Sequence, residues 1–129
     1  MSMQEYKIVS LNVNGLRNPI KQNKLITKMK REQQQIIFWQ ETHLCDVEHE
    51  KLKYRGFKNT FFSSYQQRQM RGVAILISDK ITFQLLEQIA DSEGSFILVK
   101  GHIDHRMVTL LNIYRPQVLI KHFSQKYSI

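Results

Sequence analysis

The chain has 129 residues, of which 42% are hydrophobic and 10% aromatic, so it has the size and apolar content of one folded domain. It has no apolar run near ~18 residues, no signal-peptide core and one cysteine, Cys45; we expect no membrane span, no internal disulfide and an intracellular location. Nineteen Lys+Arg against eleven Asp+Glu give a formal net charge of +8, which favours a polyanionic partner such as nucleic acid.

The first predicted elements are a strand, a turn and a helix. Apolar residues alternate through residues 6–13 and stop at Asn14-Gly15, which predicts a strand that enters a turn. From Pro19 onward the apolar residues recur at helical spacing, and proline is tolerated in a first helical turn. The sequence therefore predicts an amphipathic helix that begins near Pro19.

This helical segment is strongly basic. From residue 17 to residue 31 it has six basic residues and no acid: Arg17, Lys21, Lys24, Lys28, Lys30 and Arg31. Such a run is typical of a surface that contacts the phosphates of nucleic acid, and it is also typical of a solvated helix face.

The next segment is a short apolar strand that leads into an acid. Residues 36–40 (IIFWQ) predict a buried strand with Trp39 in the core, and Glu41 follows directly. Residues 43–54 have a weak helical period that Gly56 would close. Thr42 is then a candidate helix N-cap, with His43 at the start of the helix.

From residue 56 onward the sequence is rich in predicted strands, in residues 56–65, 72–78, 81–90, 94–103 and 106–114. The last two are separated by a spacing that suits a hairpin turn. The whole pattern, β-α-β followed by an antiparallel meander, predicts a mixed α/β domain. Several strands are apolar on both faces and need a covering layer on each side, for which the sequence offers too few helices. We therefore expect the chain to be part of a larger sandwich.

Polar side chains occur where three of the predicted strands end. Asn12 and Asn14 follow the first strand, Glu41 the second, and Asn112 and Tyr114 lie at the end of the last one. Strand ends at one edge of a sheet can converge on one site. Carboxylate and amide oxygens are the hard ligands that Mg²⁺ takes, with water and phosphate filling its other positions. A basic surface beside such a site suggests a phosphodiester substrate.

Four segments together resemble a known family. "VSLNVNGLR", "QETHL", "RGVAILIS" and "LLNIYRP" occur in the order and rough spacing of the endonuclease/exonuclease/phosphatase superfamily. The resemblance is strongest to exonuclease III-like apurinic endonucleases and above all to the endonuclease domain of LINE-type retrotransposons. It covers residues 6–117, so residues 1–117 are assigned to the N-terminal part of such a domain and residues 118–129 to a divergent tail. The resemblance implies a four-layer, DNase I-like α/β sandwich, of which this is about the first half.

The resemblance also implies roles for individual residues. Glu41 matches the metal-binding glutamate and Asn12 the asparagine beside it, with Mg²⁺, or Mn²⁺, as the metal. Asn14 falls close to the same metal, Tyr114 matches the tyrosine on the scissile phosphate, and Asn112 begins that motif. The implied activity is hydrolysis of DNA, by nicking or by cleavage at apurinic sites, in the nucleus.

Contacts with DNA are a further expectation, which rests on charge and position. The residues expected to bind the nucleic-acid backbone are Arg17, Lys21, Lys24 and Arg115. We expect DNA as the partner, with no membrane and no small-molecule cofactor, and a second half-domain or another chain to cover the sheet.

The sequence departs from the family in two ways. The last motif closes as "YRPQ", with Arg115 and Gln117 where the family has a small residue and asparagine. The aspartate, asparagine and final aspartate–histidine pair of the family's second half have no counterpart, since no acid follows Gln117 and the one histidine there is His122. The sequence thus predicts a weakly active or inactive chain.

Other interpretations stay open. The chain could be a non-catalytic retroelement remnant that binds nucleic acid through its basic face, or a phosphatase of the same superfamily. Glu41 could be a solvated strand end, Asn12 and Asn14 simple turn residues, and Tyr114 a core aromatic. A zinc site at His102 and His105 would lack the second pair of ligands that such a site needs.

Overall fold

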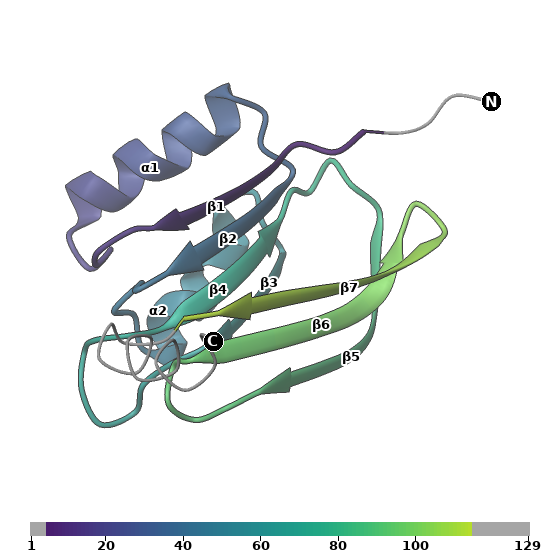
Figure 1. The fold of residues 1–129 in the computed structure, drawn as a ribbon. Coiled ribbons are helices and arrows are strands. Elements are labelled where there is room, and N and C mark those ends of the chain that lie inside the picture. The colour runs from purple at the N-terminus through teal and green to yellow at the C-terminus, as the bar shows by residue number, and fades with distance from the viewer. Residues whose placement is uncertain (1–4, 115–129) are drawn as a thin grey trace, which may run out of the picture.

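The structure, a computed structural model, describes residues 5–114. Its elements are β1 (Ile8–Asn12), α1 (Pro19–Arg31), β2 (Ile36–Gln40), α2 (Asp46–Lys51), the 3₁₀ helix η1 (Leu52–Arg55), β3 (Asn59–Ser63), β4 (Val73–Ile77), β5 (Phe83–Ala90), β6 (Phe96–Ile103) and β7 (Arg106–Ile113). They form a four-stranded sheet of order β1-β2-β4-β3 and a three-stranded sheet of order β5-β6-β7 (Figure 1). Residues Arg115, Gln117 and His122, and the boundary expected at residue 117, lie outside the described residues.

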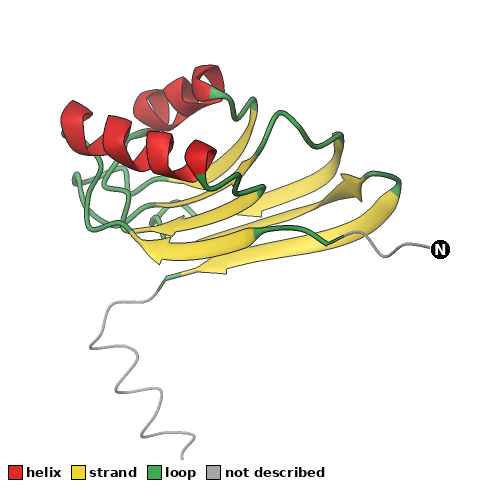
Figure 2. Ribbon diagram, turned by 90° about the horizontal axis from the view of Figure 1, so that it is seen from above, coloured by secondary structure: helices red, strands yellow, loops and turns green. Residues whose placement is uncertain are grey.

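The described chain forms three layers. Figure 2 shows the helices on one side of the four-stranded sheet and the three-stranded sheet on its other side. β1 and β2 pair in parallel through α1, and every other strand pair is antiparallel. The predicted mixed α/β architecture, β-α-β followed by antiparallel strands, is therefore confirmed. None of the helices in residues 5–114 is long and apolar enough to cross a membrane.

Two hydrophobic clusters hold these layers together. One lies between the helices and the four-stranded sheet, where the predicted core residue Trp39 is fully buried. The other fills the space between the two sheets. Every residue of β4 is buried because this strand contacts both clusters, which explains why "VAILI" is apolar on both of its faces.

Helix α1 begins where the sequence predicts. Asn18 is its N-cap, and the Asn18 side-chain oxygen accepts hydrogen bonds from the backbone N–H groups of Ile20 (2.8 Å) and Lys21 (3.3 Å). Pro19 occupies the first turn, where its missing N–H costs nothing. Ile26 and Met29 are buried against the sheet, so the basic residues of the helix are left on its outer side.

The predicted start of the second helix is wrong. Its N-cap is Cys45, whose backbone N–H donates to the Glu48 carboxylate at 3.0 Å. Thr42 is instead fully buried, and His43 has a φ of 60°, so it lies in a turn and not in the first turn of a helix. The local sequence resembles a cap, but a tertiary contact of Thr42, described below, takes precedence.

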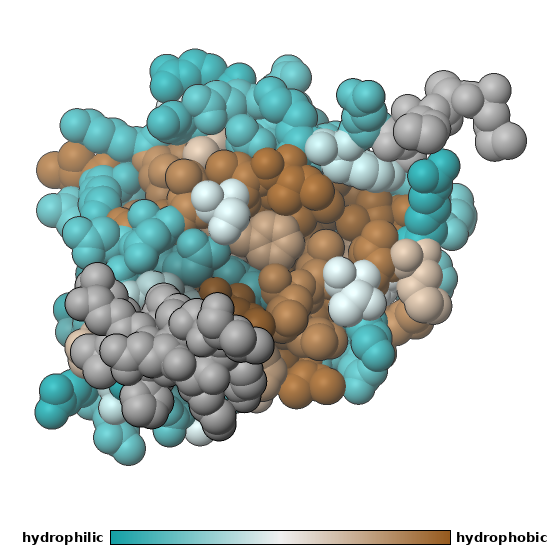
Figure 3. Space-filling model, viewed as in Figure 1, coloured by the Kyte–Doolittle hydropathy of each residue, from teal (hydrophilic) through white to brown (hydrophobic). Residues whose placement is uncertain are grey.

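The second sheet leaves apolar surface uncovered. Large side chains of its outer face are exposed, and no helix in residues 5–114 covers them: Ile89, Met107, Leu111 and Ile113. Figure 3 shows hydrophobic side chains gathered over β1, β2, β7 and β6.

A groove of about 450 Å³ also opens between the sheets, lined by Ile8, Phe38, Leu111 and Ile113 among others. Within the described chain, β1 and β7, which border the groove, are edge strands of their sheets. The expectation of too little cover is therefore confirmed for this part of the chain.

Replacing Leu111 by Lys is expected to reduce self-association with a loss of less than about 1 kcal/mol in the free energy of unfolding, because Leu111 is 48% exposed. Analytical ultracentrifugation and urea denaturation measure the two effects. The neighbouring Leu110→Lys is the matched control, since Leu110 packs against the inter-sheet core and its replacement should unfold the protein. Equal stability of the two variants would contradict this assignment of faces.

Candidate active site

The ends of three strands bring polar side chains together at one edge of the molecule. In the parallel register of β1 and β2, Asn12 pairs with Gln40, so Glu41 emerges beside Asn12. The Asn12 side-chain amide donates to the Glu41 carboxylate at 2.8 Å. Tyr114 directly follows β7 of the other sheet, and its hydroxyl also forms a hydrogen bond with Glu41. Glu41, Asn12 and Tyr114 therefore form one cluster, as the sequence predicts.

Asn12 and Asn14 shape the turn that borders Glu41. The side-chain oxygen of Asn12 accepts the backbone N–H of Asn14 at 3.0 Å, so both ends of the Asn12 amide are held. Asn14 adopts a φ of 50° and is exposed at the edge of the site. Asn12 and Asn14 are therefore turn residues, and they also lie next to Glu41.

Tyr114 contributes a neutral hydroxyl to the site. Burial, the hydrogen bond to Glu41 and the negative charge of Glu41 all raise the pKa of Tyr114, while the positive charge of Arg71 lowers it. The phenol therefore keeps its proton at neutral pH and can donate a hydrogen bond. Its ring packs against the inter-sheet core, so Tyr114 is a core aromatic whose hydroxyl reaches the site.

Asn112 is buried two residues before Tyr114. Its amide nitrogen donates to the carbonyl groups of Trp39 (3.0 Å) and Ala74 (2.9 Å), and its oxygen accepts from the Gln40 side chain at 2.8 Å. These bonds tie β7 to β2 and β4 of the other sheet. Through these bonds Asn112 fixes the end of β7 and so positions Tyr114. The direct part in catalysis that the sequence predicts for Asn112 stays a prediction.

Of the expected DNA-binding residues, Lys21 and Lys24 lie near the cluster. Lys21 and Lys24 line a shallow groove of about 290 Å³ along β1, which also includes Asn12 and Lys28. The Lys21 ammonium donates to the backbone oxygen of Asn14 at 3.0 Å. Arg17 lies 3.5 Å from Glu48 and also contacts Gln69, so part of its charge is already matched.

Arg71 is a residue near the site for which the sequence predicted only a place in a solvated loop, residues 66–71, that could touch DNA. Its guanidinium lies 4.5 Å from the centre of the Tyr65 ring and 3.5 Å from the Glu93 carboxylate, and its charge acts on Tyr114. Its backbone oxygen accepts the N–H of His43 at 2.7 Å. The one signal in the sequence is its place as the first residue of "RGVAILIS".

The donor set of the cluster suits one kind of metal. Glu41 supplies one carboxylate; the Asn12 amide faces Glu41 with its nitrogen and the Asn14 N–H with its oxygen, so it would ligate a metal only after the amide turned. Residues 5–114 contain no group of three or more His, Cys, Asp and Glu side chains that could hold a metal ion. One carboxylate with an amide fits Mg²⁺ or Mn²⁺ that keeps water and phosphate as its other ligands. It does not fit a closed zinc site.

A buried polar cluster lies behind Glu41. His49 is fully buried, with Nε2 2.8 Å from the Thr42 hydroxyl and Nδ1 2.9 Å from the Ser64 hydroxyl. Burial lowers the pKa of His49 from its ordinary value of 6.5 to about 4, against the smaller raising effect of Asp46 and Glu48. His49 is therefore neutral at physiological pH. Sequence reasoning missed this cluster.

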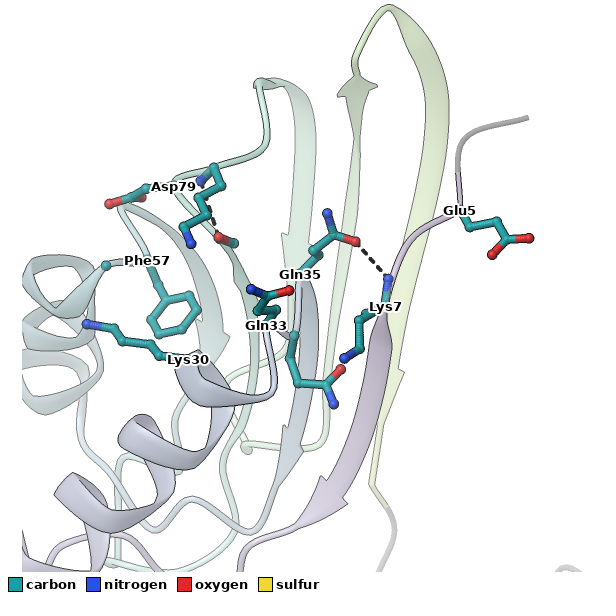
Figure 4. Close-up of a pocket in the computed structure, with 11 residues that line it drawn as sticks. Glu5, Lys7, Lys30, Gln33, Gln35, Phe57 and Asp79 are labelled. Carbon is teal, nitrogen blue, oxygen red and sulfur yellow. Dashed lines mark hydrogen bonds between the residues drawn. The ribbon is translucent and has the colours of Figure 1, made fainter. Parts of the chain in front are cut away.

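A different pocket, of about 620 Å³, lies at the opposite end of the first sheet, before β1 and β2 begin (Figure 4). Lys7, Lys30 and Lys80 line it together with Glu5 and Asp79. The polar groups there bind one another: the Gln35 side-chain oxygen accepts the N–H of Lys7 at 2.8 Å. This pocket therefore has no part in the cluster around Glu41.

The fold is similar to those of several solved structures. The chain matches an AP endonuclease from Archaeoglobus fulgidus with a TM-score of 0.59 and 21% identity, over 97% of this chain and 53% of that one. It matches the endonuclease domain of TRAS1, a telomere-specific non-LTR retrotransposon, with a TM-score of 0.56 and 15% identity, over 95% and 53%. TDP2 from Caenorhabditis elegans gives a TM-score of 0.61 and 16% identity, over 94% and 41%.

No protein-family model matches the chain. The chain spans about half the length of the structures it resembles, or less. The likeness therefore concerns the fold of this chain.

Acidification tests the buried state of His49. Unfolded chains take up a proton at His49 below pH 6.5, whereas the folded protein does so only near pH 4. The stability that neutral His49 contributes is complete above pH 6.5, and it should fall by about 3 kcal/mol as the pH drops from 6.5 to about 4. Urea denaturation across this range measures it. A His49→Gln variant should lack this part of the slope, and His105→Gln, at an exposed residue, should retain it.

Proposed function

From a fold that corresponds to half of an endonuclease/exonuclease/phosphatase domain, we propose that this chain is the metal-binding half of a divalent-metal-dependent DNA phosphodiesterase. The observation that carries the proposal is the cluster of Glu41, Asn12 and Tyr114 at the strand ends. A solvated strand end would not need two hydrogen-bond donors from two different sheets.

The proposed roles follow from the chemistry of each group. Glu41, with Asn12 beside it, would hold Mg²⁺ or Mn²⁺, and the metal when bound would polarise a phosphate oxygen and stabilise the leaving oxygen. Tyr114, protonated at neutral pH, would donate a hydrogen bond to the negative charge that develops on the scissile phosphate. Lys21 and Lys24 would hold the DNA backbone in the groove next to Asn12.

A water-activating group would have to come from elsewhere. In the family that the sequence resembles, an aspartate–histidine pair from the second half does this, and the printed sequence has no acid after Gln117. Loss of such a group costs orders of magnitude in rate. We therefore propose that the chain alone binds metal and DNA and nicks DNA weakly or not at all.

Metal binding and nicking are tested on the same protein. In Glu41→Gln, Mn²⁺ affinity measured by electron paramagnetic resonance is expected to fall at least about 10-fold, because the carboxylate is lost. Glu50→Gln is the control, since Glu50 is exposed on α2 and pairs with Lys53. With Mg²⁺, supercoiled plasmid should stay largely intact. Unchanged Mn²⁺ affinity would refute the metal site, and robust nicking abolished by Glu41→Ala would refute the missing base.

DNA binding through the groove predicts a specific salt dependence. The double variant Lys21→Gln, Lys24→Gln should bind duplex DNA more weakly and flatten the slope of log affinity against log salt by about two. Fluorescence anisotropy across a salt series measures both quantities. Lys80→Gln with Lys100→Gln removes the same charge away from the groove and should change the slope less. Equal effects would point to non-specific attraction by the net charge.

A non-catalytic nucleic-acid-binding chain is the second candidate. The net charge of +8 and the lysine-lined groove favour it. DNA binding with no Mn²⁺ affinity at Glu41 would decide for this candidate.

A further inference from the structure

We propose that His49 is a positioning residue that, through Thr42, holds the turn that presents the Glu41 carboxylate. The inference rests on the proposed function only for the role of Glu41 as a metal ligand. The geometry of the turn and of the buried cluster stands independently of it.

The turn after β2 adopts conformations that have to be enforced. Glu41 has a φ of 55° and His43 a φ of 60°, and both are ordinary residues in the left-handed region. Such conformations are unfavourable for residues other than glycine and persist where the surrounding contacts hold them. The direction of the Glu41 side chain therefore depends on the contacts that hold residues 41–43.

Thr42, which lies between these two residues, is held by hydrogen bonds. Its N–H donates to the Gly72 oxygen at 3.1 Å, and its own oxygen accepts the N–H of Leu16 at 2.8 Å. The Thr42 hydroxyl lies 2.8 Å from His49 Nε2. It also lies so close to Gly72 that a β-carbon on that residue would clash with it. Thr42 thus joins the loop after β1, the loop before β4 and helix α2.

His49 anchors this contact from behind. Its ring stacks on Phe62 with centroids 4.8 Å apart and an interplanar angle of 11°, and its second nitrogen meets the Ser64 hydroxyl. A neutral imidazole has one donor and one acceptor, and hydroxyl groups can serve either one. The imidazole is therefore held at both nitrogens and on one face, which makes it a rigid support for the Thr42 side chain.

The position of α2 is fixed independently. Glu48 caps the helix at the backbone N–H of Cys45 and lies 3.5 Å from Arg17 in the loop after β1. Asp46 accepts a hydrogen bond from the Gln66 side chain at 3.0 Å. The helix that carries His49 is therefore tied to the same loops that surround Glu41.

The test separates positioning from general stability. Thr42→Val keeps the shape and removes the hydroxyl, Thr42→Ser keeps the hydroxyl, and His49→Phe keeps a flat ring without nitrogens. Thr60→Val is the matched control: Thr60 is also buried, and its hydroxyl donates to the Phe57 oxygen at 2.6 Å, away from the turn. All are compared under conditions in which each variant is folded.

Two measurements are made on each variant: amide hydrogen exchange of Leu16, Thr42 and His43 by NMR, and Mn²⁺ affinity. In Thr42→Val and His49→Phe we expect faster exchange at these amides and about 10-fold weaker Mn²⁺ binding, as is typical when a residue behind a metal ligand is lost. Thr42→Ser should restore both, and Thr60→Val should leave both as in the parent. Because the Thr42 hydroxyl also accepts the N–H of Leu44 at 3.4 Å, the variants at Thr42 do not by themselves isolate His49. If His49→Phe does not fold, His49→Gln, which keeps a donor and an acceptor but not the ring, replaces it and should give intermediate exchange rates at these amides.

Two results would overturn the proposal. One is the same exchange rates at these three amides in Thr42→Val as in the parent. The other is an equal increase in Thr60→Val, which would mean that any lost buried hydroxyl has this effect. If the parent binds no Mn²⁺, the proposed function fails, and the exchange rates alone decide whether His49 and Thr42 hold the turn.

Discussion

The candidate site depends on the parallel pairing of β1 with β2. The register sets Asn12 opposite Gln40, so the next residue, Glu41, meets the Asn12 amide at 2.8 Å. A slip of β2 by one residue would turn all of its side chains to the opposite faces of the sheet and remove Trp39 from its core. The amphipathic α1 provides the crossover that parallel strands require. Lys21 and Lys24 of α1 therefore lie beside the site because the same helix makes the parallel pairing possible.

Buried polar groups complete what the strand pairing begins. Asn112 ties the second sheet to the first with three hydrogen bonds and so brings Tyr114 to Glu41. His49 and Thr42 support the turn from the helix side. Buried polar groups destabilise a fold unless they find partners, and here each of these side chains has one. The side chains around Glu41 are thus held from three directions.

The same architecture leaves the described chain open on one side. Its helices cover one face of the first sheet, and the outer face of β5-β6-β7 keeps exposed side chains such as Ile89 and Leu111. Ile89, Leu98 and Leu111 are opposite one another across the three strands, so they form a continuous apolar row. The structures of similar fold are about twice as long as this chain, or longer. The uncovered face of the described residues thus goes together with a fold of about half that length.

Local patterns in the sequence were enough to predict the order and type of the elements, the start of α1 at Pro19 and the buried strand before Glu41. They also predicted that Asn12, Glu41 and Tyr114 lie at strand ends. These follow from alternation, helical spacing and short motifs, which are local in the chain. Only the tertiary structure decided that Thr42 packs on His49 and does not cap a helix, that Asn112 joins the two sheets, and that the charge of Arg71 acts on Tyr114. Most of these contacts join residues far apart in the chain, and at Thr42 the buried hydrogen bond outweighs a local capping preference. The distant contacts and the hydrogen bond of Thr42 cannot be predicted from the local sequence pattern, because they depend on which surfaces the packed sheets and helices bring together.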